Sequence, residues 1–466
     1  MAIGIGIDFG TTNSAAAVYD GERVVLVQLE RDDAIMPSAT YVDAALQTDT
    51  GQRAIERYIA DNTGRTVEMI PEVIAETSQF VEGDGGGDEP GAVDTSTTKI
   101  YGLPLTDSGL KGRLFRGIKR LLGDERVRRL MVFDHPFRLV ALITPIVLRM
   151  RKSVEEDAGA ASTWSGGAHL GHPVNFEGRD EYRNQLALSR LSEAYRYAGV
   201  TNQHFYPEPI AAAVSYLQAE PMQGEHLLTF DFGGGTLDLC VLKRQGQHFD
   251  VITTHGIGLG GDHIDQRLFR ELLFPLLGKG ERWRRRGMDR EIETRFPFED
   301  YEELLVNWAV TYTLNQNRYT APVMDRIAQG DAAARKFERL RDLIKRNASY
   351  QVFQKIKDFK ATLSQETSAV LDIPELDIEV RLERSDFETL IRDLLEQAAQ
   401  AVDDTLAKAG LSAEQVDVVL RTGGSSLIPA VTDILSERFP GKVVSHDPFT
   451  SVATGLAIAN YHGLEP

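Results

Sequence analysis

Residues 227–242, LLTFDFGGGTLDLCVL, constrain the fold of this chain more than any other segment. Two apolar runs flank an aspartate and three consecutive glycines, a pattern typical of two strands joined by a turn. Gly233, Gly234 and Gly235 allow positive φ and let a ligand reach main-chain N–H groups that side chains would otherwise shield. Asp231 adds a carboxylate just before the bend. Such a turn predicts a phosphate chain as its ligand.

Residues 3–18, IGIGIDFGTTNSAAAV, repeat this pattern, with Asp-Phe-Gly between an apolar run and small hydroxylated residues. One such segment alone is explained as well by an ordinary hairpin, but the repetition favours two turns that face each other. Asp8 and Asp231 would then hold a hydrated Mg²⁺ between them. Mg²⁺ suits this arrangement because it keeps several waters and takes one or two carboxylates together with phosphate oxygens.

The composition is that of a globular chain and argues against some partners. Its 466 residues, 42% hydrophobic and 26% charged, are enough for two or more domains. A net charge of −18 argues against a nucleic-acid or anionic-membrane partner. The single cysteine, Cys240, cannot form an internal disulfide, and neither a signal-peptide pattern nor a membrane-spanning apolar run is present. We therefore expect a cytoplasmic protein.

Helices are predicted in the first half over 137–156, 180–197 and 206–217. The last of these has a proline in its first turn and three small residues, Ala211 to Ala213, that allow close packing on a neighbour. Glu208 lies at its N-terminus, where it either caps the helix or activates a water beside a bound phosphate.

Residues 111–123, KGRLFRGIKRLLG, are basic and amphipathic. On spacing alone they predict a surface helix with Lys119 in water. A functional role for Lys119 needs support from outside this segment.

Further glycine turns follow in the second half. Gly260 and Gly261 belong to the cluster GIGLGGD, which precedes a predicted helix over 264–277. Gly423, Gly424 and Ser425 follow a buried strand and precede a helix that begins at Pro429. A strand, a glycine turn and a helix N-terminus again predict an anion or nucleotide site.

The remainder of the second half is expected to be mainly helical from 280 to 375, with the arginine cluster of 282–290 on a solvated helix or loop. A strand is predicted over 377–382. Residues 385–388 form a capping-box pattern that predicts the start of the next helix.

The order of these motifs resembles the nucleotide-binding domain of the Hsp70 chaperones, within the actin, hexokinase and Hsp70 ATPase superfamily. IGIDFGTTNS and FDFGGGTLD are similar to the two phosphate motifs, VVLRTGGSSLIP to the adenosine motif, and GHPVNF and YPEPIAAAVSY to the segments between them. The combination is highly specific and covers nearly the whole chain. The resemblance implies an α/β protein with the two-lobed actin-like ATPase fold, built from duplicated ribonuclease H-like domains with a nucleotide cleft between the lobes.

The resemblance also implies a division of the chain. Lobe I is expected over 1–223, with a core in 1–38 and 136–223 and an inserted subdomain in 39–135. Lobe II is expected over 224–444, with a core in 224–265 and 376–444 and an inserted helical subdomain in 266–375. Residues 445–466 would form a C-terminal helix that returns to lobe I. Since the sequence stops at ANYHGLEP, we expect no substrate-binding domain, as in the short Hsp70-like proteins of bacteria.

The resemblance assigns roles for binding ATP or ADP with Mg²⁺. Asp8 and Asp231 would hold the metal through water. Lys119 would orient the γ-phosphate and the attacking water, because GIKRLLG is similar to the family's Ile-Lys-Arg-Leu-Ile-Gly, and Glu208 would position that water. With Asp231 and Thr236 these two residues form the expected catalytic set. The expected nucleotide contacts are Gly10, Thr11, Thr12, Asn13, Gly233, Gly234, Gly235, Gly260, Gly261, Lys360, Ser364, Gly423, Gly424 and Ser425.

The chain departs from the family in the base pocket. Ala361 and Leu427 stand where the family has two arginines that sandwich the adenine, and Lys357 stands in place of a glutamate. Cation–π contacts of this kind contribute roughly 0.5–2 kcal/mol each. The departures therefore imply weaker or less adenine-selective binding. The segment 280–350 is also longer than the corresponding cap of the family and does not match it.

Slow Mg-dependent ATP hydrolysis that drives lobe opening and closing is the function implied by the resemblance, in a chaperone-related protein. The alternative is a nucleotide-sensing scaffold that binds a partner and hardly hydrolyses ATP. A sugar or acid kinase of the same superfamily would need an aspartate base aimed at an acceptor hydroxyl, and the sequence has no motif for one. As partners we expect a nucleotide and an unidentified protein, with no nucleic acid or membrane, and we expect a monomer.

Overall fold

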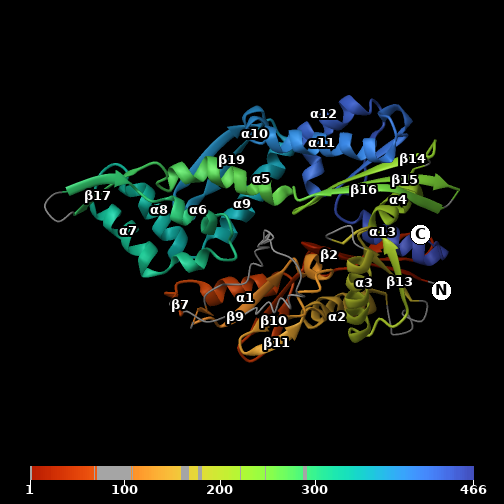
Figure 1. Ribbon diagram of the computed structural model, residues 1–466, viewed down its shortest axis with the longest axis horizontal. Coiled ribbons are helices and arrows are strands. Elements are labelled where there is room, and N and C mark those ends of the chain that lie inside the picture. The colour runs from red at the N-terminus through yellow and green to blue at the C-terminus, as the bar shows by residue number, and fades with distance from the viewer. Residues whose placement is uncertain are drawn as a thin grey trace, which may run out of the picture.

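The computed structural model describes residues 3–67, 69–70, 106–107, 109–158, 167–176, 181–220, 222–246, 248–286 and 291–465. These residues form two α/β lobes, one above the other in Figure 1, and the two chain termini lie near the same end. The lower lobe, red to yellow, comes from the first part of the chain, and the upper lobe, green to blue, from the second. The two-lobed α/β fold predicted from the sequence is confirmed.

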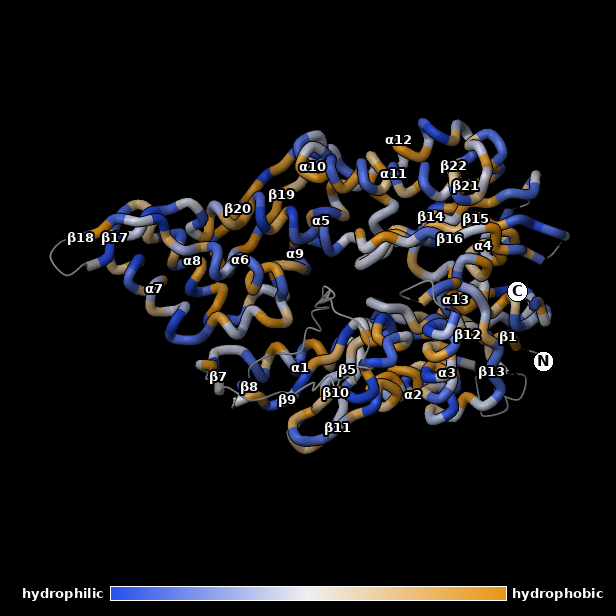
Figure 2. Tube along the Cα trace, viewed as in Figure 1, coloured by the Kyte–Doolittle hydropathy of each residue, from blue (hydrophilic) through white to orange (hydrophobic). Residues whose placement is uncertain are grey.

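The core of lobe I is a sheet flanked by helices. Its elements are β1 (Gly4–Phe9), β2 (Asn13–Tyr19), β3 (Val24–Leu26), β4 (Met36–Pro37), α2 (Leu139–Ala158), β12 (Ala168–His172), α3 (Glu181–Tyr197), β13 (Gln203–Pro207) and α4 (Glu208–Ala219). The strand order is β13-β12-β1-β2-β3, with β4 paired to β2. β1 runs antiparallel to β2, with Asp8 opposite Ala15, and parallel to β12. Apolar stretches follow α2 in Figure 2, where it packs on this sheet.

Lobe II repeats this topology. Its core elements are β14 (His226–Phe232), β15 (Leu237–Gln245), β16 (His248–Ile257), α11 (Arg392–Ala409), η7 (Ala413–Gln415), β21 (Val418–Thr422), η8 (Gly424–Leu427), α12 (Pro429–Arg438) and β22 (Val443–Ser445). The strand order is β16-β15-β14-β21-β22. β14 is antiparallel to β15, with Asp231 opposite Asp238, and parallel to β21. β14 therefore corresponds to β1, and the two strands place Asp8 and Asp231 at equivalent positions.

Helix α4 and the last helix, α13 (Ser451–His462), pack between the two sheets. Their contact is close, because a Cβ on Gly455 would lie 1.7 Å from the carbonyl oxygen of Ala211. α13 also meets β1 closely, since a Cβ on Gly6 would lie 2.3 Å from the oxygen of Ala453. The close packing predicted for Ala211 to Ala213 is confirmed, and these two helices join the lobes at the base of the cleft.

An inserted subdomain extends from the core of each lobe. Lobe I contributes β5 (Ala39–Asp43), β6 (Thr48–Thr50), α1 (Gln52–Asn62), β7 (Met69–Ile70), β8 (Thr106–Asp107), β9 (Gly112–Arg116), η1 (Ile118–Leu121), β10 (Arg129–Val132) and β11 (His135–Arg138). Lobe II contributes α5 (Gly261–Leu268), η3 (Phe269–Leu273), η4 (Phe274–Leu276), β17 (Arg282–Arg286), β18 (Glu291–Arg295), α6 (Glu299–Leu305), η5 (Thr311–Leu314), α7 (Asn317–Ala328), α8 (Ala334–Lys345) and α9 (Ser349–Gln365). The hairpin β19 (Ser368–Ile373) and β20 (Ile378–Glu383) with η6 (Pro374–Leu376), and then α10 (Arg384–Leu390), lead back to the core.

The two inserted subdomains touch each other across the cleft, and we call this region the interlobe contact. The Tyr58 hydroxyl donates to the carbonyl oxygen of Ala309 at 2.5 Å, and the Asn315 amide donates to that of Arg65 at 2.7 Å. The Tyr58 ring also meets Tyr312 edge-on in a shared apolar cluster.

Trp308 extends the interlobe contact. It stacks under the Arg116 guanidinium, 4.7 Å from its ring, and packs edge-on against Tyr350. The cleft is thus bounded by α4 and α13 at its base and by the interlobe contact at its mouth.

Two predictions about local structure in the basic segments are wrong. The expected surface helix over 111–123 is instead the strand β9 followed by the short helix η1, because Gly117 adopts a φ of 65° between them. The arginine cluster is not on a helix or loop but begins in the strand β17, where Arg284 pairs with Glu293 of β18. An arginine run has no alternation of polarity that would reveal a strand.

Other boundaries also differ from prediction. The segment 280–375 is helical only from α6 onward, after the β17–β18 hairpin. α10 begins at Arg384 after Glu383, without a side-chain capping bond, so the predicted capping box is wrong. Within the described residues, no helix combines the length and apolar character needed to cross a bilayer.

Candidate nucleotide-binding site

The two glycine turns predicted to bind phosphate face each other across the cleft. A Cβ built on Gly234 would lie 3.5 Å from the Thr12 hydroxyl oxygen. The first turn is tight, because a Cβ on Gly10 would lie 2.0 Å from the carbonyl oxygen of Asn13. Ser38 donates its backbone N–H to the oxygen of Thr12 at 2.8 Å and fixes the end of the turn. Thr11 lies between these residues and is half-buried.

The second turn is supported from below by other backbone segments of lobe II. Gly261 donates its N–H to the oxygen of Gly233 at 2.9 Å, and Asp262 donates to that of Gly234 at 2.7 Å. A Cβ on Gly260 would lie 2.3 Å from the oxygen of Gly234. A side chain at this position would therefore push the turn out of place, which explains why the cluster is glycine.

The third turn completes this cradle. The Ser425 hydroxyl donates to the carbonyl oxygen of Gly233 at 3.3 Å. Gly423 has a φ of 78°, and a Cβ there would lie 2.6 Å from Oδ1 of Asp231. A side chain at 423 would thus fill the space beside the carboxylate. The three glycine segments of lobe II, distant in the sequence, form one surface of backbone groups.

Asp8 and Asp231 lie at the ends of equivalent strands and titrate far from their usual range. Burial, and then the Glu208 carboxylate, raise the pKa of Asp8 to about 7 against the opposing charge of Lys119. Burial, and then the carboxylates of Asp238, Glu208 and Asp8, raise the pKa of Asp231 to about 7 as well. Buried carboxylates whose charged form is disfavoured in this way are stabilised by a nearby cation.

The structure places Lys119 differently from the spacing prediction. Its side chain is 5% exposed, and Nζ lies 2.6 Å from Oε1 of Glu208. Glu208 begins α4, with Pro209 beside it in the first turn, so the helix N-terminus fixes the carboxylate. The expectation of a lysine in water is therefore wrong, and the ion pair joins the inserted subdomain of lobe I to α4.

Sequence reasoning missed two charged residues at this site. The Thr236 hydroxyl donates to Oδ2 of Asp238 at 2.7 Å, and desolvation raises the pKa of Asp238 although its side chain keeps solvent access. A Cβ on Gly235 would lie 2.0 Å from Nη2 of Arg120, so this guanidinium from lobe I lies over the second turn. Asp238 and Arg120 occur within FDFGGGTLD and GIKRLLG, so the motifs themselves carried the signal.

Lys360 and Ser364 lie on α9, at the side of the cleft where a ribose or base is expected. Lys360 forms an ion pair with the buried Asp265, with Nζ 2.6 Å from Oδ1, and donates to the oxygen of Gly261 at 3.2 Å. The Ser364 hydroxyl donates to the carbonyl oxygen of Lys360 in its own helix at 3.0 Å. Lys360 is thus held against the glycine cradle.

The residues of the site fit a Mg-nucleotide by the chemistry of their groups. Glycines occupy the positions at which a Cβ would collide with the neighbouring turn. The carboxylates of Asp8 and Asp231 lie at the strand ends beside these turns, where a metal ion could bridge them to the phosphates. Among the residues that the structure describes, no three histidine, cysteine, aspartate or glutamate side chains gather to hold a metal ion by themselves. A Mg²⁺ between Asp8 and Asp231 would therefore take water and phosphate oxygens as its other ligands.

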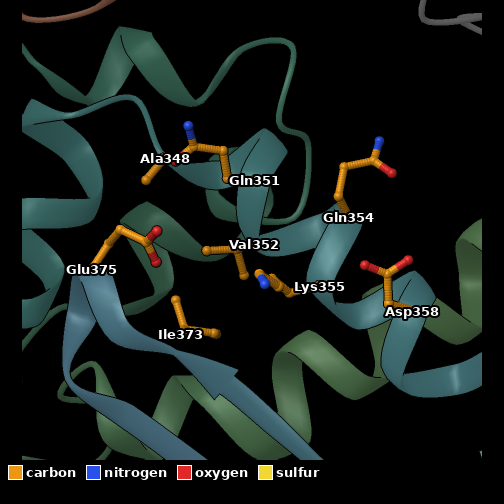
Figure 3. A pocket seen from close by; sticks show the side chains of 8 residues that line it. All are labelled: Ala348, Gln351, Val352, Gln354, Lys355, Asp358, Ile373 and Glu375. Atoms are coloured by element: carbon orange, nitrogen blue, oxygen red, sulfur yellow. The ribbon is translucent and has the colours of Figure 1, made fainter. Parts of the chain in front are cut away.

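A cavity of about 300 Å³ lies elsewhere in lobe II, between α9 and the β19–η6 segment (Figure 3). None of the residues predicted to contact the nucleotide lines it. Its lining mixes polar and apolar side chains, and its residues are Ala348, Gln351, Val352, Gln354, Lys355, Asp358, Ile373 and Glu375.

Comparison with known proteins agrees with the geometry of the cleft. The family model described as Hsp70 protein matches residues 181–277 and 329–461, which include the second and third glycine turns, Glu208 and Lys360. Curated Hsp70 proteins align with 97–98% of the chain. The chain belongs to the Hsp70 family. The family match is interrupted between 277 and 329, in the stretch that supplies Trp308 and Tyr312 to the interlobe contact. The segment 280–350 was predicted not to match, but the match resumes at 329, so the prediction is wrong for its last part.

Three relatives illustrate the distance within the Hsp70 family. The chain is 26% identical over 465 residues to heat shock 70 kDa protein BIP3 of Oryza sativa, 25% over 467 residues to chaperone protein DnaK 3 of a Synechococcus species, and 25% over 471 residues to a heat shock 70 kDa protein of Neurospora crassa. These alignments cover 56%, 57% and 58% of the relatives. The chain therefore spans little more than half the length of the curated relatives it matches.

Proposed function

We propose that this chain binds Mg-ATP in the cleft between its lobes, hydrolyses it slowly, and couples the reaction to lobe opening and closing in a chaperone-related role. The observation that carries the proposal is the ion pair between the buried Lys119 and Glu208, which lies close enough to Asp8 for both charges to act on its carboxyl group. Membership of the Hsp70 family supports the same function.

Phosphate binding falls to the backbone in this proposal. The glycine turns have no side chains of their own to shield their main chain from a phosphate, and the hydroxyl groups of Thr12 and Thr236 lie at the same turns. Arg120 lies over Gly235 and adds a positive charge from lobe I. When bound, Mg²⁺ would neutralise charge on the phosphates. Asp8 and Asp231 would hold it through water.

Lys119 and Glu208 act on the reacting groups. Lys119 orients a γ-phosphate oxygen and the attacking water, and Glu208 accepts a hydrogen bond from that water. The water oxygen attacks the γ-phosphorus, the bond to the ADP oxygen breaks, and the water proton ends on the released phosphate or in solvent. Catalysis of this kind rests on positioning and charge stabilisation, because the protein forms no covalent bond.

Lobe movement follows from the contacts at both ends of the cleft. Nucleotide held by both turns favours the closed arrangement, because Thr12 and Arg120 belong to lobe I and the glycine cradle belongs to lobe II. Release then requires the interlobe contact to open while α4 and α13 keep the lobes joined. The interlobe contact would make such opening slow.

A nucleotide-sensing scaffold with little or no hydrolysis is the second candidate. Two observations favour it. Ala361 and Leu427 are exposed in place of the base-clamping arginines, and the lobe II side of the interlobe contact comes from the stretch that interrupts the family match between 277 and 329. A partner protein would then bind the closed, nucleotide-bound arrangement of the lobes.

Calorimetric titration of the nucleotide-free chain with Mg-ATP and Mg-GTP, followed by phosphate-release assays, separates these functions. The ATPase predicts micromolar Mg-ATP binding and slow phosphate release without an acceptor. Binding without release supports the scaffold, and formation of ADP without phosphate release, dependent on a sugar or carboxylic acid that takes up the phosphoryl group, supports a kinase. Undetectable binding of both nucleotides would reject the proposed function.

A further inference from the structure

An exposed aromatic ring lies against the third glycine turn of lobe II. Phe449 is 52% exposed, and it alone among the phenylalanines of the described segments is exposed by more than a third. A Cβ built on Gly424 would lie 2.8 Å from its Cε1 atom, so the ring touches the turn. Leu427, from the same turn, is 39% exposed. One exposed apolar side chain is ordinary, but two at one turn of a binding cleft suggest a ligand surface.

The loop that carries Phe449 is held in place by its own hydrogen bonds. The Asp447 carboxylate accepts the N–H of Phe449 at 3.4 Å, the N–H of Thr450 at 3.2 Å, and the Thr450 hydroxyl. Gly423 donates its N–H to the oxygen of Pro448 at 2.8 Å and ties the loop to the turn. A ring on a fixed loop loses little freedom when a ligand packs on it.

The same turn contacts the phosphate cradle on its other side. Gly423 borders the Asp231 carboxylate, and Ser425 donates to the oxygen of Gly233. A Cβ on Gly261 would lie 2.5 Å from the Ser425 hydroxyl and 3.1 Å from Nζ of Lys360. Within this turn, Gly423 and Ser425 contact the phosphate cradle, while Gly424 contacts the Phe449 ring. The turn therefore lies between a polar surface and an apolar one.

We propose that Phe449, which packs on the turn that also carries the exposed Leu427, is the surface on which the base of the bound nucleotide stacks, in place of the arginine clamp. The inference rests on the proposed function, because it takes as its ligand the nucleotide whose phosphates lie on the glycine cradle. Stacking uses the π-face that every base has, and no polar side chain is needed to read the base edge. The site therefore distinguishes little between adenine and guanine.

The nucleotide explains this surface better than a protein partner does. Phe449 packs on Gly424, and the residues on either side of Gly424 contact the phosphate cradle. A nucleotide is a ligand with one charged end and one flat aromatic end. Such a ligand occupies both surfaces at once. The same experiment tests the alternative that Phe449 binds a protein partner. In that case, replacing Phe449 would leave the affinity for nucleotides unchanged.

The test compares the dissociation constants of Mg-ATP, Mg-GTP and Mg-tripolyphosphate, which has no base, in calorimetric titrations of the full chain. Phe449→Ala should raise the Kd of both nucleotides about tenfold and leave that of tripolyphosphate unchanged. Phe449→Trp should keep both nucleotide Kd values within about twofold. Val370→Ala, which removes an equally exposed apolar side chain from β19 in the same lobe, should change none of the three.

Four results would overturn the inference. Equal weakening of tripolyphosphate would mean that Phe449 only supports the turn, unchanged nucleotide affinity in Phe449→Ala would place the base elsewhere, and a strong preference for ATP over GTP would require a group that reads the base edge. A wild-type chain that binds tripolyphosphate but neither nucleotide more tightly also overturns it. A wild-type chain that binds none of the three ligands rejects the proposed function itself, so the two failures are distinguishable.

Discussion

The Nζ atom of Lys119 lies 2.6 Å from Oε1 of Glu208, although 88 residues separate them in the sequence. The lysine is buried and the carboxylate is 24% exposed, so the pair faces the cleft from the carboxylate side. An ammonium group has three N–H donors, and one bond to Glu208 leaves donors for a phosphate oxygen or a water. The pair is thus a positioned donor and acceptor next to Asp8.

Replacement of Glu208 by glutamine tests the acceptor. Glu208→Gln keeps the size of the side chain but removes the charge that pairs with Lys119 and draws the water proton. Turnover should fall by about a hundredfold or more, the scale for loss of an acid–base group, while the Kd of Mg-ATP changes by only a few-fold. Phosphate release and calorimetry measure the two quantities. Glu156→Gln, an exposed site on α2, is the matched control and should leave both unchanged.

Two glycines of one cluster test the backbone cradle. Gly260→Ala places a Cβ 2.3 Å from the oxygen of Gly234, whereas Gly258→Ala enters open space. The first change should destabilise the protein by about 1–3 kcal/mol, as overpacking does, and weaken tripolyphosphate binding strongly. The second should alter neither the melting temperature nor the Kd. Equal behaviour of the two variants would contradict a requirement for close backbone contact.

The metal site predicts a linked change in thermal stability. A ligand at 100 times its Kd stabilises the folded state by about 2.7 kcal/mol, so Mg-ATP should raise the melting temperature of the wild-type chain. Chelation of Mg²⁺ or the change Asp231→Asn should remove most of that increase. Asp372→Asn, on the exposed face of β19, serves as control. An increase that survives both chelation and Asp231→Asn would exclude a metal at this carboxylate.

The interlobe contact predicts slow nucleotide release. Trp308→Ala removes the contact with the Arg116 guanidinium of lobe I, together with the packing on Tyr350 within lobe II. The loss of one such contact corresponds to about a tenfold faster release of a fluorescent nucleotide in stopped-flow measurements. Ile292→Ala changes an exposed side chain of the β17–β18 hairpin and should not affect release. If Trp308→Ala releases nucleotide at the wild-type rate, the interlobe contact does not limit opening.

The phosphate turns could be predicted from the sequence because their requirement is local. An aspartate at the end of a strand, followed within a few residues by glycines, is enough to predict each turn. The order of these motifs along the chain then predicts the fold. The contact of Gly234 with Thr12 follows from the duplication of the two hairpins, which gives Asp8 and Asp231 equivalent positions.

The environment of Lys119 could not be predicted in the same way. Lys119 can be buried because Glu208 of α4 pairs with its charge. The pattern of apolar residues within 111–123 contains no information about this distant contact. β17 was missed for a related reason: Arg284 and Arg286 lie opposite Glu293 and Glu291 of β18, which become neighbours only once the hairpin has formed. Phe449 belongs to no motif that the sequence analysis recognised. Its possible role follows only from its contact with the third glycine turn, which the sequence does not reveal.

Single-turnover hydrolysis tests the central claim most directly. The wild-type chain and Lys119→Met are each saturated with Mg-ATP, with binding verified by calorimetry, and the release of γ-phosphate is followed in one turnover. The ATPase account predicts slow, complete release by the wild type and loss of at least about a hundredfold in Lys119→Met, with little change in Kd. Lys111→Met, an exposed lysine of the same subdomain, should behave as wild type. Phosphate release at the wild-type rate from Lys119→Met would contradict the role assigned to the Lys119–Glu208 pair.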